Sequence, residues 1–570
     1  MMDKLVYYLR SWIQSPFVIL VALVLLATSA YINVLDGKFI WDDEVMVAGN
    51  GLIRSLDNIP AILTTSPFGG RLNASDFYRP FQTLSYAVDY SIWGLDPTGF
   101  HLTNLILHGI TVLVLFILLR RLGYSSWVSG GVSAIFAVHP LNTESVSYIS
   151  GRGDVMYLLL CLSVFWLFTV TTFRRAWIIP ISLGLYWVAL LTKENSVPLG
   201  VMLAGLIVFP VFGNLNKTQK ISAGLLAASS IFYSGLRAYF LASDGNTILS
   251  WIANADLMTR IKTIPYCVVT YFRLFILPYP LHMEYHYVET SWLNPYLWVG
   301  MPFIAVAGFV IWKYSLSRAK TVFWMVWIMV CLGPVLQLVP LASTVREHWA
   351  TMAELGFWVA VLSVLDIQSK SKLWVTTGLI CGIAVYWSLT VVRNEDWRDP
   401  IQLYRHDVAF EPKSFLLHNN LGVELFRKNE LSGAKIEFEA AIDTSPNQPL
   451  GYGTALNNLG AIYEGRGDLV KAEGLYIKAI ESSQYELAYC NLARVLLIRG
   501  DVANALNYVH QGIEHYPYNA TLKLMLVGAL FSGHHPDDAE REARNLLMMY
   551  PEYGSQVDFL RRQYEANPRR

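Results

Sequence analysis

The sequence predicts an all-α protein in two parts, a polytopic membrane domain of about 11 transmembrane helices followed by a short α-solenoid of helical repeats. Of the 570 residues, 54% are apolar and only 15% are charged, whereas soluble domains carry about 25% charged residues. Long apolar runs separated by short polar breaks extend to about residue 392, and ordinary amphipathic sequence with a regularly spaced alanine follows. We therefore divide the chain into a membrane domain, 1–392, and a repeat domain, 393–570.

Charge and cysteine usage exclude several classes of protein. Lys plus Arg and Asp plus Glu each number 43, so the formal net charge is zero. A nucleic-acid-binding protein would carry a basic excess, and we expect no nucleic acid as partner. The five cysteines are far apart and form no Cys-x-x-Cys pair. Neither a zinc site nor a disulfide framework is supported.

The first part of the chain contains a series of apolar runs that are long enough to form transmembrane helices. A helix needs about 20 apolar residues to cross the hydrocarbon core, and fewer when its ends reach toward the headgroups. Eleven segments fit: 17–35, 101–119, 125–139, 155–173, 176–192, 196–213, 220–241, 295–312, 321–340, 352–367 and 373–391. A twelfth run, 264–280, contains Arg273 and three prolines, so we interpret it as a re-entrant or interfacial helix.

Basic residues set the expected orientation. Lys and Arg collect in six polar breaks, namely Lys4 with Arg10, Arg120 with Arg121, Arg174 with Arg175, Lys217 with Lys220, Lys313 with Arg318 and Lys320, and Lys370 with Lys372. With eleven spans all six fall on one side, which the positive-inside rule identifies as the cytoplasm. The N-terminus is then cytoplasmic. The repeat domain is periplasmic or extracellular, or lumenal in a eukaryote.

The repeat domain shows self-similarity when it is indexed on one alanine. Ala434, Ala472, Ala505 and Ala539 recur at intervals of 38, 33 and 34 residues. Twelve residues before each lies a small or medium residue that follows a leucine, as in Leu421-Gly422 and Leu459-Gly460. This pattern resembles the tetratricopeptide repeat, a pair of helices that approach closely at small residues. We expect about four repeats whose surface binds a peptide or a partner protein.

Three acids follow the first apolar run and are the leading catalytic candidates. They are Asp42, Asp43 and Glu44, directly after Trp41. Neighbouring carboxylates raise one another's pKa and can keep a proton acceptor near neutral pH. The alternative is a solvated loop start that stops the helix from sliding into the membrane. Spacing alone does not separate these two interpretations.

Further charged residues lie in the breaks on the same side. Cations that topology does not require indicate an anionic ligand with a lipid tail, such as a polyprenyl phosphate. The cations are Arg79, Arg152, Lys193, Arg346 and His348, and the other candidate site residues beside Glu44 are His139, Glu144, Asp154 and Glu194. For each of them a helix-end anchor or an ion pair within the protein is the alternative.

The order of these motifs resembles a known family. Trp41-Asp42-Asp43, Tyr78-Arg79-Pro80, His139-Pro140-Leu141-Asn142-Thr143-Glu144, Gly151-Arg152-Gly153-Asp154 and Thr192-Lys193-Glu194-Asn195, followed by a repeat tail, are similar to the transmembrane and tetratricopeptide repeat-containing protein O-mannosyltransferases and their prokaryotic relatives. The resemblance implies a GT-C glycosyltransferase that uses a polyprenyl-phosphate-linked sugar outside the cytoplasm. It also implies that Asp42 and Asp43 form the catalytic centre.

A single displacement fits these expectations. One Asp takes the proton of a Ser or Thr hydroxyl of a protein acceptor as that hydroxyl attacks the sugar, and the polyprenyl phosphate leaves. The resemblance implies that the sugar is mannose. We expect Arg152, Lys193 and Arg346 to stabilise the departing phosphate, and Arg79 and His348 are the second choices for this role. This scheme requires no cofactor or metal, although the three acids could bind a divalent ion. The alternatives are a non-enzymatic membrane-anchored scaffold and a flippase for lipid-linked sugars.

Overall fold

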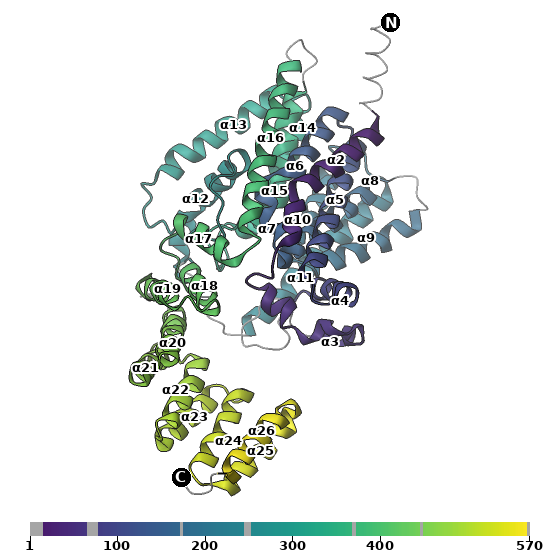
Figure 1. Ribbon diagram of the computed structural model, residues 1–570. Helices are drawn as coiled ribbons and strands as arrows, with labels where there is room; N and C mark the ends of the chain where they lie inside the picture. The colour runs from purple at the N-terminus through teal and green to yellow at the C-terminus, as the bar shows by residue number, and fades with distance from the viewer. Residues whose placement is uncertain are drawn as a thin grey trace. The chain divides into compact units, whose positions relative to one another are not determined.

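The computed structural model describes residues 15–64, 78–170, 175–243, 252–366, 372–444 and 449–566. Lys4, Arg10, Arg174 and Lys370 of the predicted basic clusters lie outside these ranges. Throughout the described chain the elements are helices and connecting loops, with an isolated antiparallel bridge between Tyr285 and Val345 (Figure 1). The predicted all-α class is therefore confirmed.

The chain folds as two compact units, Met1–Phe410 and Glu411–Arg570. The sequence placed the division at residue 393, but helix α17 (Pro400–Phe410) lies in the first unit. The other helices of this unit are α2 (Pro16–Tyr31), α3 (Ile59–Ile62), α4 (Pro80–Trp93), α5 (Pro97–Arg121), α6 (Ser126–Val138), α7 (Thr143–Ser147), α8 (Arg152–Thr169), α9 (Arg175–Leu190), α10 (Val197–Val208), α11 (Lys217–Ser243), α12 (Leu257–Ile276), α13 (Met301–Tyr314), α14 (Arg318–Leu332), α15 (Thr351–Leu365) and α16 (Lys372–Asp396). Short 3-10 or π-helical turns join several of them.

Within the described ranges, seven helical segments are long and apolar enough to cross a membrane, so the protein is a multi-pass membrane protein. They are Pro16–Asp36, Pro97–Arg121, Ile149–Thr169, Tyr296–Tyr314, Arg318–Val335, Glu347–Leu365 and Leu373–Asp396. The other four predicted spans are also helical. Three of these helices, α6, α9 and α10, have only 13, 16 and 12 residues, and α11 carries Lys217, Lys220 and Arg237. The expected count of eleven therefore rests on helices that are short or partly polar.

Helix α12 occupies most of the run predicted to be re-entrant or interfacial. It continues through Pro265 and ends just before Pro278. One face buries Cys267, Tyr271 and Leu274. The helix is not among the seven candidate spans, and its interfacial placement stays a prediction.

The main apolar core of the first unit is built largely from α5, α6, α8, α14 and α15, and a separate small cluster includes Met46, Ile53, Tyr86 and Phe100. Phe165 of α8 stacks on Trp327 of α14 at 6.0 Å between ring centres. By contrast, α13 buries no residue, and Phe303, Val306 and Phe309 on it are exposed. An apolar helix without a buried face is stable only against an apolar solvent, which indicates that α13 faces lipid.

The described part of the second unit consists of four pairs of helices, as the repeat pattern predicted, followed by a final helix, α26. They are α18 (Phe415–Arg427), α19 (Leu431–Thr444), α20 (Pro449–Gly465), α21 (Leu469–Ser483), α22 (Glu486–Ile498), α23 (Val502–His515), α24 (Ala520–Ser532), α25 (Pro536–Met549) and α26 (Gly554–Ala566). The four indexing alanines are fully buried in the second helix of each pair. A Cβ atom at Gly422 would lie 2.5 Å from the Phe438 ring, so a small residue is needed where the helices meet.

Candidate functional site

The acidic motif lies where the chain leaves the first span and turns. After α2 and the 3-10 turn Ile32–Asp36, Trp41 adopts φ 56°, in the left-handed region that bulky residues rarely use. Its ring stacks on Tyr148 at 5.8 Å, and the Arg346 guanidinium lies 5.1 Å from its centre. Such local strain persists only where the surroundings hold it. The turn at Trp41 directs the next two carboxylates into different environments.

Asp43 is completely buried and acts as a structural clamp. One carboxylate oxygen accepts hydrogen bonds from the Ser150 backbone N–H at 2.7 Å and the Ser150 hydroxyl at 2.5 Å, and the other accepts from the Ile40 N–H at 3.1 Å. Burial raises the pKa of Asp43 to about 7, although these hydrogen bonds act to lower it. The carboxylate thus ties the acidic motif to the loop before α8.

Asp42 is only half-buried and directly follows Trp41, whose ring centre lies 5.1 Å from the Arg346 guanidinium. Its backbone N–H donates to the Tyr148 hydroxyl at 3.1 Å. Burial raises the pKa of the Asp42 carboxyl above its usual value. Arg346, the Tyr148 hydroxyl and Arg79 act in the opposite direction but do not outweigh burial. A carboxylate with a raised pKa next to guanidinium groups combines a proton acceptor with anion recognition. The structure therefore distinguishes two acids that spacing could not separate. Glu44, also half-buried, begins the short π-helical turn Glu44–Ala48.

Arg346 is held near this motif by residues that sequence reasoning missed. Its guanidinium binds Glu284 at 3.1 Å, and the other oxygen of Glu284 lies 2.8 Å from His286 Nε2. The Tyr271 hydroxyl donates to the Arg346 carbonyl at 3.3 Å. Glu284 and His286 lie in the connection between α12 and α13, far in sequence from every motif. Only the X-Glu-X-His pattern within a long loop could have drawn attention to them.

His348 and Glu144 form an ion pair that adjoins Arg346. His348 Nδ1 lies 2.8 Å from Glu144, and the His348 backbone N–H donates to the same carboxylate at 3.2 Å. Burial raises the pKa of Glu144, but His348 and Arg346 outweigh burial and hold it below its usual range. The sequence-predicted residues Glu144, Arg346 and His348 are therefore brought together.

A second charged cluster surrounds Glu194. Arg79 donates to both Glu194 oxygens at 2.8 and 3.4 Å, and Arg237 lies 3.5 Å from the same carboxylate. Next to Glu194 in the chain, Lys193 binds both oxygens of Asp154 at 2.6 and 2.7 Å. Arg79 also lowers the pKa of Asp42, so it links this cluster to the acidic motif. Arg237 lies within the predicted span 220–241 and is not among the site candidates that the sequence indicates.

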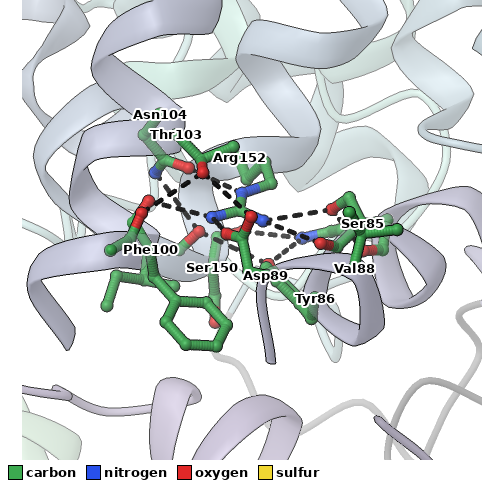
Figure 2. A network of polar contacts seen from close by, with 12 residues as sticks. Ser85, Tyr86, Val88, Asp89, Phe100, Thr103, Asn104, Ser150 and Arg152 are labelled. Atoms are coloured by element: carbon green, nitrogen blue, oxygen red, sulfur yellow. Dashed lines mark hydrogen bonds and ion pairs between the residues drawn. The ribbon is translucent and has the colours of Figure 1, made fainter. Parts of the chain in front are cut away.

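Arg152 does not match the donor-binding role predicted for it. The side chain is completely buried, pairs with Asp89 at 2.5 Å, and donates to Asn104 at 2.7 Å and to the Phe100 carbonyl at 2.9 Å (Figure 2). A further donation to the Ser85 carbonyl uses the remaining terminal nitrogen. This guanidinium joins α4, α5 and α8 to one another. We assign it a structural role, because a phosphate would have to displace several buried partners.

His139 and Lys193 are likewise enclosed by protein. His139 is completely buried; its Nε2 lies 3.1 Å from the Phe275 carbonyl and its Nδ1 accepts from the Leu141 N–H at 3.3 Å. It caps the short turn Pro140–Asn142. Lys193 is 5% exposed and committed to Asp154. Among the predicted phosphate ligands, Arg346, Arg79 and His348 are the ones that lie around Asp42 or its immediate partners.

The carboxylates of the acidic motif are candidate metal ligands. Within the ranges that the structure describes, no three His, Cys, Asp or Glu side chains form a group that could hold a metal ion. The Asp43 carboxylate is turned toward Ser150, whereas Asp42 lies beside arginines. The two acids therefore do not present a shared set of oxygen ligands.

The chain is similar to known proteins both in its repeats and over longer stretches. The tetratricopeptide repeat family matches residues 453–484. The protein O-mannosyl-transferase Tmtc1 of Drosophila melanogaster is 31% identical over 42% of this chain and 28% of its own length. Human protein O-mannosyl-transferases TMTC1 and TMTC3 are 24% and 23% identical over 75% and 82% of this chain, and 55% and 57% of their own lengths.

The chain is thus a multi-pass membrane protein with a tetratricopeptide-like repeat unit. More particularly, it is a distant homologue, at 23–31% identity, of the TMTC protein O-mannosyltransferases with tetratricopeptide repeats. It spans about half the length of the two human proteins that it matches. This similarity covers both units, since the longer alignments extend over most of the chain.

Proposed function

We propose that this protein transfers a mannosyl group from a polyprenyl-phosphate donor to Ser or Thr hydroxyls of protein acceptors, as a GT-C glycosyltransferase. The observation that carries the proposal is the environment of Asp42, a half-buried carboxyl with a raised pKa beside Arg346 and Arg79. Homology to proteins named protein O-mannosyl-transferases supports the reaction class.

In the proposed mechanism Asp42 accepts the proton of the acceptor hydroxyl while the oxygen of that hydroxyl forms a bond to the anomeric carbon of the sugar. The bond from that carbon to the donor phosphate breaks, and the phosphate leaves with the electron pair. Arg346 and Arg79 stabilise the developing negative charge. A guanidinium has five N–H donors, so Arg346 can hold Glu284 and still bind a phosphate oxygen. Asp43 positions Asp42 through its hydrogen bonds to Ser150.

The assignment of sides follows from the basic clusters. We propose that all eleven predicted spans lie in the membrane, where neighbouring helices surround the short helices α6, α9 and α10. We also propose that the acidic motif and the repeats face away from the cytoplasm. A reporter that is active only in an oxidising compartment, fused after Arg570, should then be active. Activity of a cytoplasmic reporter at the same position would reverse the proposed orientation.

The experiment that tests the function uses purified protein in lipid nanodiscs with polyprenyl-phosphate mannose and a Ser/Thr-containing peptide. We expect wild-type transfer and a loss of about 100-fold to 10,000-fold in kcat for Asp42→Asn, the range that general base catalysis contributes. Donor binding should be largely retained. Asp57→Asn is the matched control, because Asp57 is an exposed acid on the same loop that bonds only locally. Normal turnover by Asp42→Asn would exclude it as the base.

A non-enzymatic scaffold is the second candidate, favoured by the tetratricopeptide match at residues 453–484. The two functions differ in the same assay. A scaffold would transfer no sugar from any polyprenyl-phosphate donor, yet it would still retain a protein partner through the repeats.

A further inference from the structure

A pocket lies at the end of the first unit opposite to the acidic motif. Its volume is about 140 Å³, and its lining includes Arg121, Phe165, Phe168, Leu206, Phe212 and Gln219. Helix α5 begins at Pro97, near the Arg152 network, and ends at Arg121. At 1.5 Å per residue its 25 residues span about 37 Å. The pocket therefore belongs to the other membrane face and takes no part in the chemistry proposed for Asp42.

The rim of the pocket carries cations held at defined positions. Arg121 donates to the Thr169 carbonyl at 3.2 Å, which joins the ends of α5 and α8. Lys320 donates to the Leu122 carbonyl at 2.9 Å, and its Nζ lies 5.6 Å from the centre of the Phe212 ring. Leu122, Thr169 and Phe212 all line the pocket. Two positive charges from different helices are thus fixed beside an apolar cavity.

A helix begins at the same place. Asn216 and Gln219 bond reciprocally, each backbone N–H donating to the other side chain at 3.0 Å, and this starts α11. The Gln219 amide also donates to the Phe168 carbonyl at 2.8 Å. The N-terminus of a helix carries partial positive charge, which adds to the charge of Arg121 and Lys320.

No carboxylate offsets these charges in the segments that build the pocket. Residues 118–126, 165–170, 206–220 and 315–321, as far as the structure describes them, include Arg120, Arg121, Lys217, Lys220, Arg318 and Lys320, and no Asp or Glu. The pocket walls are aromatic and aliphatic apart from the rim. Basic pockets between membrane helices bind anionic lipid headgroups. An occupant that matches this surface is an amphiphile with a negative headgroup and an apolar chain.

We propose that this pocket binds one anionic phospholipid, with its phosphate at Arg121 and Lys320 and the beginning of an acyl chain among Phe165, Phe168 and Phe212. A phospholipid fits better than free phosphate because most of the lining is apolar. The site is a second lipid site, separate from any site for the sugar donor. The proposal does not depend on the proposed function.

The test uses the full-length protein purified in a neutral detergent and titrated with phosphatidylglycerol or phosphatidylcholine. Bound lipid is counted by native mass spectrometry, and thermal stability is followed in parallel. We expect one phosphatidylglycerol to bind tightly and to raise the Tm. Arg121→Gln with Lys320→Gln keeps side-chain donors and removes both charges. At about 1 kcal/mol for each cation, this double variant should weaken binding roughly tenfold or more.

Two further variants separate a built site from a generally basic surface. Lys217→Gln with Lys220→Gln removes two exposed charges from the same face that do not line the pocket, and it should change affinity by less than about threefold. Asn214→Trp places a large ring at the exposed pocket mouth without altering any charge, and it should abolish the tightly bound lipid.

Three results would overturn the proposal. The first is equal weakening by both double variants, which would assign binding to the whole basic face. The second is phosphatidylcholine that binds as tightly as phosphatidylglycerol. The third is displacement of the lipid by millimolar inorganic phosphate, which would assign the site to a free anion.

Discussion

Asp43 shows how a single buried carboxylate can fix a neighbouring one. Replacing Asp43 by Asn puts an NH₂ group where a carboxylate now accepts from the Ser150 N–H and hydroxyl or from the Ile40 N–H. Leaving buried donors without an acceptor costs about 1–3 kcal/mol. We therefore expect Asp43→Asn to lower the free energy of unfolding by that amount, as measured by thermal unfolding in detergent. Asp57→Asn should not change it.

The same carboxyl gives a pH dependence with a defined sign. Burial raises the pKa of Asp43 to about 7, and an unfolded Asp titrates near pH 4. Between about pH 4 and 7 the folded chain holds a proton that the unfolded chain has lost, so this group makes stability fall as the pH rises. Asp43→Asn should flatten the stability curve in that window. An unchanged slope would mean that Asp43 is ionised in the folded protein at pH 4.

Arg346 should control the pH profile of turnover. A general base works when deprotonated, and Arg346 is the strongest of the influences that lower the pKa of Asp42. Arg346→Gln removes that positive charge, so the acidic limb of kcat/KM should move to higher pH. Arg79→Gln should move it less, because Arg79 lowers the pKa of Asp42 less than Arg346 or the Tyr148 hydroxyl does. Limbs at the same pH in both variants would show that another group is the base.

The candidate acids could be predicted from the sequence, but the sequence could not show that Asp43 is buried and hydrogen-bonded while Asp42 stays available for chemistry. Trp41-Asp42-Asp43 after an apolar run indicates a polar motif at a membrane face. Which acid is free for chemistry depends on Ser150 and Arg346, which folding alone brings to the motif. The structural partners of Arg152 could not be predicted for a similar reason, since Asp89 and Asn104 carry no signal of pairing with it in the sequence.

At the scale of helices, the repeat unit depends on small residues where paired helices meet. A Cβ atom at Gly460 of α20 would lie 2.6 Å from the Tyr476 ring of α21, whereas one at Gly474 of α21 would meet nothing within 4 Å. We expect Gly460→Ala to destabilise the second unit by about 1–3 kcal/mol through overpacking. Gly474→Ala should stabilise it by up to about 1 kcal/mol, because alanine favours the helix. Chemical denaturation of the full chain, followed by a probe in the repeats, measures both.

Helix positions were easier to predict than spans. Periodic alanines predicted the repeat pairs because buried small residues recur wherever two helices touch. Apolar runs predicted helices at all eleven positions, but helix length depends on where each turn begins, and α6 and α10 end after 13 and 12 residues. A short apolar run does not reveal whether lipid or protein surrounds it, so composition alone leaves those helices undecided.

In the whole molecule, the end of the membrane unit reaches past the last span. Asp407 of α17 pairs with Arg393 at 2.9 Å and accepts from the Met283 N–H at 2.7 Å. Met283 immediately precedes Glu284, the partner of Arg346. Helix α17 therefore supports the loop that holds an arginine of the candidate site. This long-range support is the reason why the composition change near residue 393 does not mark the end of the first unit.

Two truncations should separate this support from the role of the repeats. A chain that ends after Phe410 keeps the first unit whole, and we expect it to glycosylate a short Ser/Thr peptide at a rate within about threefold of the full chain. A chain that ends after Val392 loses α17. It also loses Asn394, which accepts from the Ser147 hydroxyl at 2.6 Å, and Trp397, which stacks on Tyr148 at 5.3 Å.

Because Tyr148 contacts both Trp41 and Asp42, the shorter chain should lose peptide glycosylation and unfold at a lower temperature. Both truncations should fail to modify a full-length protein acceptor efficiently, since we assign acceptor binding to the repeats. Thermal unfolding distinguishes a folded inactive chain from an unfolded one. Full peptide activity in the chain ending at Val392 would contradict the support assigned to α17, and normal modification of a protein acceptor by the chain ending at Phe410 would remove the repeats from acceptor binding.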